Sequence, residues 1–121
     1  MTKRQDEFAE QVQFVRWVRS IAPKFEPFHW LHSSLNGVDL TMPQAVRMKQ
    51  AGMVAGIPDL FFPLPSKTKH GLFIEMKTHK GDLSHRQQQF KAYAESVGYV
   101  VAVAHDCVQA KQAVFDYLKE D

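Results

Sequence analysis

The chain has 121 residues, of which 45% are hydrophobic; this is enough for one buried core but not two, so we expect a single domain over residues 1–121. Its one cysteine, Cys107, excludes an internal disulfide and a zinc site of paired cysteines, and a net charge of +2 is too small to identify a nucleic-acid-binding protein. No run of residues resembles a signal peptide or approaches the roughly 18 apolar residues of a membrane span, so we expect a soluble, cytoplasmic protein.

The first half of the chain predicts two helices separated by a strand. Apolar residues recur every three or four positions between residues 5 and 22, which predicts an amphipathic helix that buries Phe8 and ends before Pro23. Residues 28–37 predict a strand that closes on an Asn-Gly turn. Residues 42–52 predict a short helix that ends at a glycine.

The second half predicts a strand pair followed by a helix, a strand and a helix. Residues 57–64 and 71–77 are apolar runs joined by a polar connector, which predicts an antiparallel hairpin. Residues 84–98 and 110–118 have helical periodicity, and residues 99–105 are apolar on both faces, which is typical of a central strand covered by helices. The predicted fold class is therefore α/β, with a central mixed sheet flanked by helices.

Charged residues interrupt the two apolar runs of the predicted hairpin. Asp59 follows Pro58 at the start of the first strand, while Glu75 and Lys77 occupy alternate positions of the second. Because side chains alternate across a strand, Glu75 and Lys77 share a face, and a suitable register places Asp59 opposite Glu75. Two such carboxylates are stable together only with a cation between them, for which a divalent ion that prefers oxygen ligands, such as Mg²⁺, is the natural candidate. Such an ion neutralises charge on a phosphate and Lys77 can assist, so the sequence indicates phosphodiester hydrolysis.

These residues also carry a resemblance to a known family. The segments RMKQAGMVAGIPDLFFPLP, GLFIEMKTHKGDLSHRQQQF and AESVGYVVAV contain, in order, Lys-x-x-Gly, Gly-x-Pro-Asp-Leu, Glu-x-Lys, Gly-x-x-Ser-x-x-Gln and Gly-Tyr elements. Over most of its length the chain thus resembles the VRR-NUC family of the PD-(D/E)XK nuclease superfamily. The resemblance implies a restriction-endonuclease-like fold and Mg²⁺- or Mn²⁺-dependent endonuclease activity on DNA. Small stand-alone members resemble Holliday-junction resolvases, which implies a homodimer acting on a four-way junction, fork or flap.

The resemblance further implies roles for individual residues. Asp59 and Glu75 are the implied metal ligands, together with the backbone carbonyl of Met76. Lys77 is the implied catalytic lysine. Each residue alone has a structural explanation, since an Asp after Pro is often a turn residue and a Glu and Lys two apart often form a solvated ion pair. Their coincidence with the family pattern favours function.

Three further positions leave alternatives open. Gln87 is an implied catalytic residue, but Ser84-x-x-Gln87 is equally a helix capping box. The family usually has an acidic residue on its first helix as a metal ligand, and Glu7 aligns best, although periodicity does not separate it from Glu10. In the loop before the second helix, Leu35 replaces the proline of the family pattern, which affects the loop's shape more than its chemistry.

The positive charge of the chain is concentrated near these residues. Residues 66–91 hold six basic and two acidic side chains, whereas the rest of the chain is slightly acidic. Singly these basic residues are ordinary solvated charges, but their clustering predicts contact with the DNA backbone. The residues concerned are Lys67, Lys69, Lys80 and Arg86.

Other functions stay open as alternatives to a structure-selective nuclease. One is a less selective nicking or end-processing nuclease, and another is a catalytically silent DNA-binding module in which the carboxylates form only an ion-pair network. A hydrolase of small phosphoesters is disfavoured, since the chain has no Gly-rich loop to cradle a phosphate.

Overall fold

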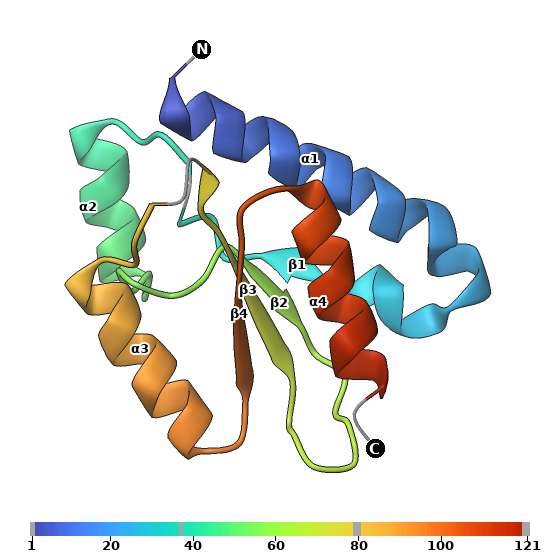
Figure 1. Cartoon of the computed structure of the whole chain (residues 1–121). Coiled ribbons are helices and arrows are strands. Elements are labelled where there is room, and N and C mark those ends of the chain that lie inside the picture. The colour runs from blue at the N-terminus through green and yellow to red at the C-terminus, as the bar shows by residue number, and fades with distance from the viewer. Residues whose placement is uncertain (1, 37, 79–80, 120–121) are drawn as a thin grey trace.

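The computed structural model describes residues 2–36, 38–78 and 81–119, which form a four-stranded sheet flanked by helices (Figure 1). The strands lie in the order β1-β2-β3-β4; the first two pairings are antiparallel and the β3–β4 pairing is parallel. The predicted mixed sheet between helices is thereby confirmed. In chain order the elements are α1 (Lys3–Ile21), the 3-10 turns η1 (Ala22–Lys24) and η2 (Glu26–Trp30), β1 (His32–Ser33), α2 (Met42–Gln50), β2 (Leu60–Phe62), β3 (Leu72–Met76), α3 (His85–Ser96), β4 (Val100–Ala104) and α4 (Cys107–Lys119).

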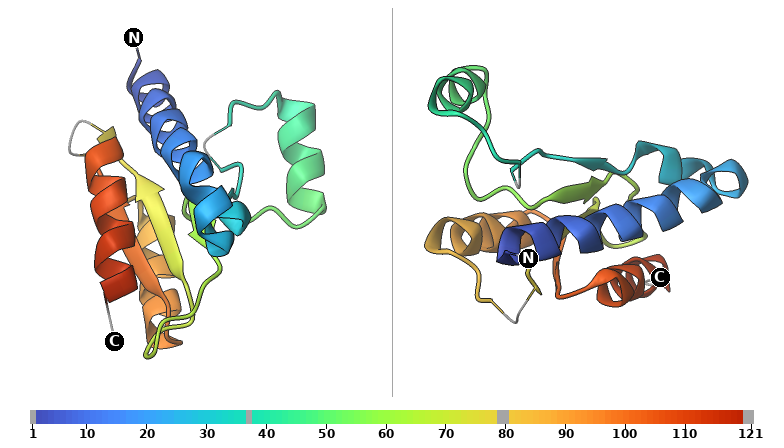
Figure 2. Two further views of the ribbon diagram at one scale, coloured as in Figure 1. Left: turned by 90° about the vertical axis from the view of Figure 1, so that its right-hand side faces the viewer. Right: turned by 90° about the horizontal axis from the view of Figure 1, so that it is seen from above.

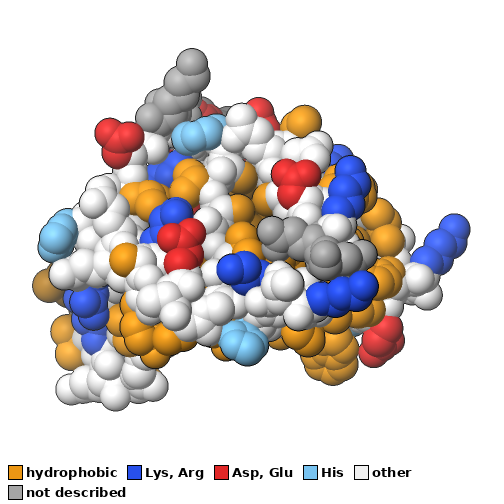
Figure 3. Space-filling view, turned by 60° about the horizontal axis from the view of Figure 1, so that its bottom comes forward, with side chains coloured by type: hydrophobic (Ala, Val, Ile, Leu, Met, Phe, Trp, Pro, Cys, Tyr) orange, Lys and Arg blue, Asp and Glu red, His pale blue; other side chains and the backbone are white. Residues whose placement is uncertain are grey.

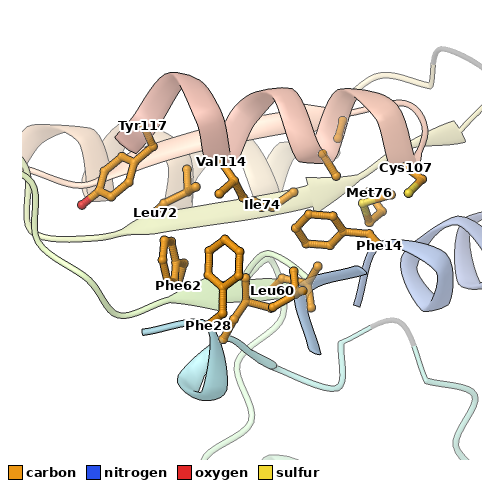
Figure 4. Packing of buried hydrophobic residues seen from close by; sticks show 14 of the residues in the cluster. Phe14, Phe28, Leu60, Phe62, Leu72, Ile74, Met76, Cys107, Val114 and Tyr117 are labelled. Carbon is orange, nitrogen blue, oxygen red and sulfur yellow. The ribbon is translucent and has the colours of Figure 1, made fainter. Parts of the chain in front are cut away.

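The two faces of the sheet are covered by different helices. Alternate residues of β2 and β3 point toward α1 and α4, where they form the hydrophobic core (Figure 4). On the opposite face, Phe73 packs against Phe90 of α3, with 5.1 Å between the ring centroids. This alternation is the one predicted from the strand periodicity. The fully buried side chains of the core include Phe14, Val18, Leu60, Phe62, Leu72, Ile74, Ala110 and Val114.

The predicted strand over residues 28–37 is wrong in its extent. Only His32–Ser33 form a strand, because the residues before it fold into the 3-10 turn η2, which contains Pro27. Arg19 of α1 holds this turn in place by donating hydrogen bonds to the carbonyls of Phe28 at 2.9 Å and Leu31 at 2.8 Å. The Asn-Gly turn predicted to follow includes residue 37, which lies outside the described residues.

Two other packing predictions are also wrong. Residues 99–105 were expected to form a central strand, but within the described residues β4 pairs with β3 alone and lies at the sheet edge. It is apolar on both faces because α3 contacts one face and α4 the other. Phe8 was expected in the core, yet it is 61% exposed, since the first turns of α1 extend toward a surface pocket rather than the sheet.

The helices differ in how deeply they are packed. Helices α1 and α4 contribute fully buried residues to the core, whereas α2 has none and stands apart from the rest of the fold (Figure 2). Among the described residues, no helix is both long and apolar enough to cross a membrane.

Candidate active site

The end of the β2–β3 hairpin brings two carboxyl groups together. Leu60 pairs with Ile74, so continuing the antiparallel register by one residue places Asp59 opposite Glu75. Both side chains are nearly buried, with exposed fractions of 9% for Asp59 and 5% for Glu75. The backbone N–H of Met76 donates a 2.8 Å hydrogen bond to Asp59 Oδ2, which fixes this carboxyl group beside β3. The observed register is thus the one that allows the two groups to meet.

The surroundings of Glu75 make its ionisation unfavourable. Burial is the main cause of a rise in its pKa from the usual 4.5 to about 9, and the charge of Asp59 and a hydrogen bond between the two carboxyl groups add to it. Lys77 lowers the pKa of Glu75, whereas Glu7 raises it slightly further. A nearby cation favours the ionised form of both carboxyl groups. Glu75 therefore keeps its proton at neutral pH unless a cation compensates the charge of its ionised form.

These carboxyl groups line a cavity of about 530 Å³. Its walls come from segments far apart in the sequence: Glu7 from α1, Ser33 from β1, Lys77 after β3, and Arg86 and Gln87 from the first turn of α3. The chain reaches this arrangement because the parallel β3–β4 pair requires α3 as its crossover, which sets the start of α3 near the end of β3.

The backbone of Lys77 is held on both sides. Its N–H donates a 2.8 Å hydrogen bond to the carbonyl of Ala104, and its own carbonyl lies 2.5 Å from Nδ1 of His105. The backbone N–H of His105 donates in turn to the side-chain oxygen of Gln109 at 2.8 Å. No sequence pattern singles out His105, because its contact with Lys77 depends on the parallel pairing of β3 and β4.

Gln87 takes part in the capping box and also lines the cavity. The N–H of Ser84 donates to Gln87 Oε1 at 2.8 Å, and the N–H of Gln87 donates to Ser84 Oγ at 3.1 Å. Within the described residues, the amide nitrogen of the Gln87 side chain has no hydrogen-bond partner. The capping box and a position at the site therefore coexist, and one amide donor stays available.

Gly56 allows the loop before β2 to lie directly against α3. Its φ is +93°, and a β-carbon at this position would lie 2.6 Å from Cγ and 2.7 Å from the carbonyl oxygen of Arg86. Any other residue would meet the backbone of α3 as well as an unfavourable dihedral angle. This close approach brings Arg86 into the same cavity as Asp59.

The two acidic candidates on α1 lie in different surroundings. Glu7 lines the cavity and contributes to the raised pKa of Glu75. Glu10 instead accepts a 2.9 Å hydrogen bond from the backbone N–H of Cys107, at the first residue of α4. A carboxylate is favourable there because the first N–H groups of a helix have no partner within it.

The basic residues of the sequence do not all gather at the cavity. Arg86 lines it, but Lys67 and Lys69 lie in the β2–β3 connection, at the opposite end of the hairpin from Asp59 (Figure 1). Figure 3 views that end, where the visible basic side chains are scattered among acidic and hydrophobic ones. Lys80 lies outside the described residues. Residues 66–91 are basic in composition, but their described basic side chains are divided among the β2–β3 connection, the end of β3 and α3.

The donor atoms at the cavity fit a hard divalent cation. Within residues 2–36, 38–78 and 81–119, no three His, Cys, Asp or Glu side chains are grouped so that they alone could hold a metal ion. Asp59 and Glu75 nevertheless supply two adjacent buried carboxyl groups. Mg²⁺ typically takes one or two carboxylates and completes its shell with waters and substrate phosphate oxygens. Two carboxyl groups in an open cavity therefore meet its requirements.

Comparison with known proteins agrees with this geometry. A family model for the VRR-NUC domain matches residues 5–106. A solved structure named "VRR_NUC domain protein" is similar to the chain with a TM-score of 0.76 and 25% sequence identity, over 94% of this chain and 88% of that one. No curated protein was found to match the sequence. The VRR-NUC domain implies a nuclease acting on DNA, and such nucleases generally depend on a divalent metal. The chain belongs to the VRR-NUC domain family.

Proposed function

We propose that this domain is a Mg²⁺- or Mn²⁺-dependent endonuclease that cleaves branched DNA, the four-way junction foremost, as a homodimer. The supporting observation is the buried pair of Asp59 and Glu75 beside Lys77. Such a pair destabilises the fold when both members are ionised, and cation binding offsets that cost. When bound, the ion would neutralise charge at the scissile phosphate and lower the pKa of a water molecule. A dimer provides one site for each of the two strands that a junction resolvase must cut.

Each residue around the ion has its own task. Asp59 and Glu75 would hold the metal ion together with the backbone carbonyl of Met76, and Glu7, which lines the same cavity, would be a further ligand. The partial burial of these two carboxyl groups lowers the local dielectric constant and strengthens their interaction with a cation. The ammonium group of Lys77 stabilises the negative charge that develops on the phosphate in the transition state.

The first turn of α3 faces the substrate. The available amide nitrogen of Gln87 donates a hydrogen bond to a phosphate oxygen or to the attacking water. Arg86 binds a neighbouring phosphate group with its guanidinium. Lys67, Lys69 and Lys80 stay predictions as contacts with DNA beyond the cavity.

The side chain of His105 positions Lys77 by donating a hydrogen bond from Nδ1 to the backbone carbonyl of Lys77. We expect His105→Ala to lower kcat for DNA cleavage by about tenfold, with a smaller change in KM, because a misplaced catalytic group loses transition-state binding first. His105→Asn should restore most of the loss, since the asparagine amide nitrogen can occupy the place of Nδ1 and donate to the same carbonyl. Steady-state kinetics of the two variants check this. Equal activity of His105→Ala and wild type would show that the contact does not position Lys77.

The proposed function is tested by cleavage of labelled four-way junction, fork, flap and linear duplex DNA with Mg²⁺, Mn²⁺ or EDTA. We expect symmetric nicking of the junction that disappears in EDTA and in Asp59→Ala. Asp116→Ala, on the exposed surface of α4, is the matched control and should cut as wild type does. Sedimentation velocity with and without the junction reports the expected dimer.

The other outcomes of this experiment separate the alternatives. Equal cutting of every substrate would favour a less selective nicking or end-processing nuclease. Binding without metal-dependent cutting would contradict the proposal and favour a silent DNA-binding module, whose affinity falls steeply as salt rises.

A further inference from the structure

One wall of the active-site cavity is apolar and open to solvent. Phe8, Leu35 and Val38 line the same cavity as Asp59, and their exposed fractions are 61%, 47% and 43%. Single exposed apolar side chains are common on protein surfaces. Three of them around one proposed catalytic cavity form a surface that a substrate must touch.

Leu35 is held in an unfavourable backbone conformation at this wall. Its φ is 68°, and within the described residues it alone among non-glycine residues has a positive φ. The left-handed region suits glycine or asparagine better than leucine, so backbone geometry does not explain the choice of this side chain.

Hydrogen bonds fix this loop to the proposed metal ligand. The N–H of Ser34 donates to the carbonyl of Asp59 at 2.9 Å, and the hydroxyl of Ser34 donates to the carbonyl of Pro58 at 2.7 Å. The N–H of Leu35 donates to Ser33 Oγ at 3.0 Å. Strained residues persist where their surroundings over-determine them, and they are concentrated at functional sites. The loop that carries Leu35 is thus hydrogen-bonded to the segment that carries Asp59.

A ligand that fills the cavity has to satisfy two unlike walls. Lys77 and Arg86 attract an anionic group, whereas Leu35 and Phe8 favour an apolar or aromatic surface. In an intact duplex, the faces of each base are covered by its neighbours in the stack. An unstacked nucleotide exposes a base face close to its own phosphate, and both aromatic and aliphatic side chains bind such faces.

We propose that Leu35, together with Phe8 and Val38, forms a nucleobase-contact site that receives an unstacked base next to the scissile phosphate. Cleavage then depends on an unstacked nucleotide near the cut. This inference rests on the proposed nuclease function and names the feature of branched DNA that the site recognises, which is the unstacked nucleotide at the branch.

The test compares a fully paired duplex with the same duplex carrying one unpaired 2-aminopurine beside the expected cut. Wild type should cleave the second substrate better, and Leu35→Gly should lower kcat/KM on it by about tenfold, as expected for loss of one base contact. The loss on the paired duplex should be smaller than the loss on the substrate that carries the unpaired base. Glycine accepts the positive φ, so this variant keeps the loop conformation, and thermal unfolding checks that it folds. Phe8→Ala should act in the same direction, and Val108→Ala, exposed on α4, is the matched control.

A second readout does not require cleavage. In EDTA, the fluorescence of the unpaired 2-aminopurine should change when wild type binds, and this change should be smaller with Leu35→Gly. If wild type cleaves no substrate, and the fluorescence change still depends on Leu35, the base contact is supported and the proposed nuclease function is contradicted. Unaltered selectivity and fluorescence in Leu35→Gly and Phe8→Ala would overturn the base contact. An equal loss of cleavage on both substrates would also overturn the base contact. A shift from dimer to monomer in these variants would overturn it too, and would show that the apolar wall is a subunit contact.

Discussion

Lys77→Ala lowers kcat for DNA cleavage by about a hundredfold or more, while DNA and metal binding are retained. The reason is that the ammonium group acts on charge present mainly in the transition state, and removing one such stabilising group typically costs about 10²–10³ in kcat. Lys77 lines the cavity beside Glu75, and its backbone is fixed by Ala104 and His105. The mutation therefore removes a charge without removing a proposed metal ligand.

Single-turnover cleavage and fluorescence anisotropy with labelled junction DNA measure the two effects separately. Lys24→Ala is the matched control, because Lys24 is an exposed lysine of η1 that does not line the cavity and is not among the predicted DNA contacts. It should leave kcat unchanged. If Lys77→Ala retained wild-type cleavage, the lysine would have no part in the mechanism. If Lys77→Ala lost DNA binding and Lys24→Ala did not, Lys77 would act as a phosphate contact.

The second large effect concerns stability: the metal-free protein becomes less stable as the pH rises from 5 to 8. The pKa of Glu75 is raised to about 9 in the folded protein and returns to about its usual 4.5 on unfolding. Between these values the folded state holds a proton that the unfolded chain has released, so the free energy of unfolding falls by up to about 1.4 kcal/mol per pH unit. Below pH 4.5 both states are protonated, and this contribution is constant.

Urea unfolding in EDTA at several pH values measures this slope. Glu75→Gln removes the titrating group and should flatten the slope, whereas Glu95→Gln, at an exposed position of α3, should preserve it. Excess Mg²⁺ should restore the stability of wild type at pH 8, because a ligand that binds only the folded state stabilises it. The same slope in Glu75→Gln as in wild type would show that another group controls the pH dependence. Calorimetry on Glu75→Gln should also show weaker metal binding.

The hairpin and its charged residues follow from local sequence pattern. Strand alternation separates the buried face of β3, with Ile74, from the face that carries Phe73 and Glu75, and it does so without knowledge of any other segment. Only one register of the antiparallel hairpin places Asp59 opposite Glu75, and this is the register observed in the structure. Ser84 and Gln87 likewise form their capping box within a single helical turn.

Helical periodicity was less informative about which residues are buried. It groups Phe8 with the core residues of α1. In the structure, however, the side chain of Phe8 is exposed. Periodicity identifies the apolar face of a helix. It does not show how much of that face packs against the sheet, because a helix can extend past the edge of the sheet.

The sequence by itself therefore determined the α/β class, the hairpin, and the carboxyl pair with its lysine, because each depends on residues within one strand pair or one helical turn. Only the tertiary structure decided that Glu7, and not Glu10, lies at the cavity, that His105 supports Lys77, and that Leu35 joins Phe8 in an apolar wall. These contacts join segments far apart in the chain. Their partners are set by how helices and strands pack in space, which no local pattern of hydrophobic and charged residues encodes.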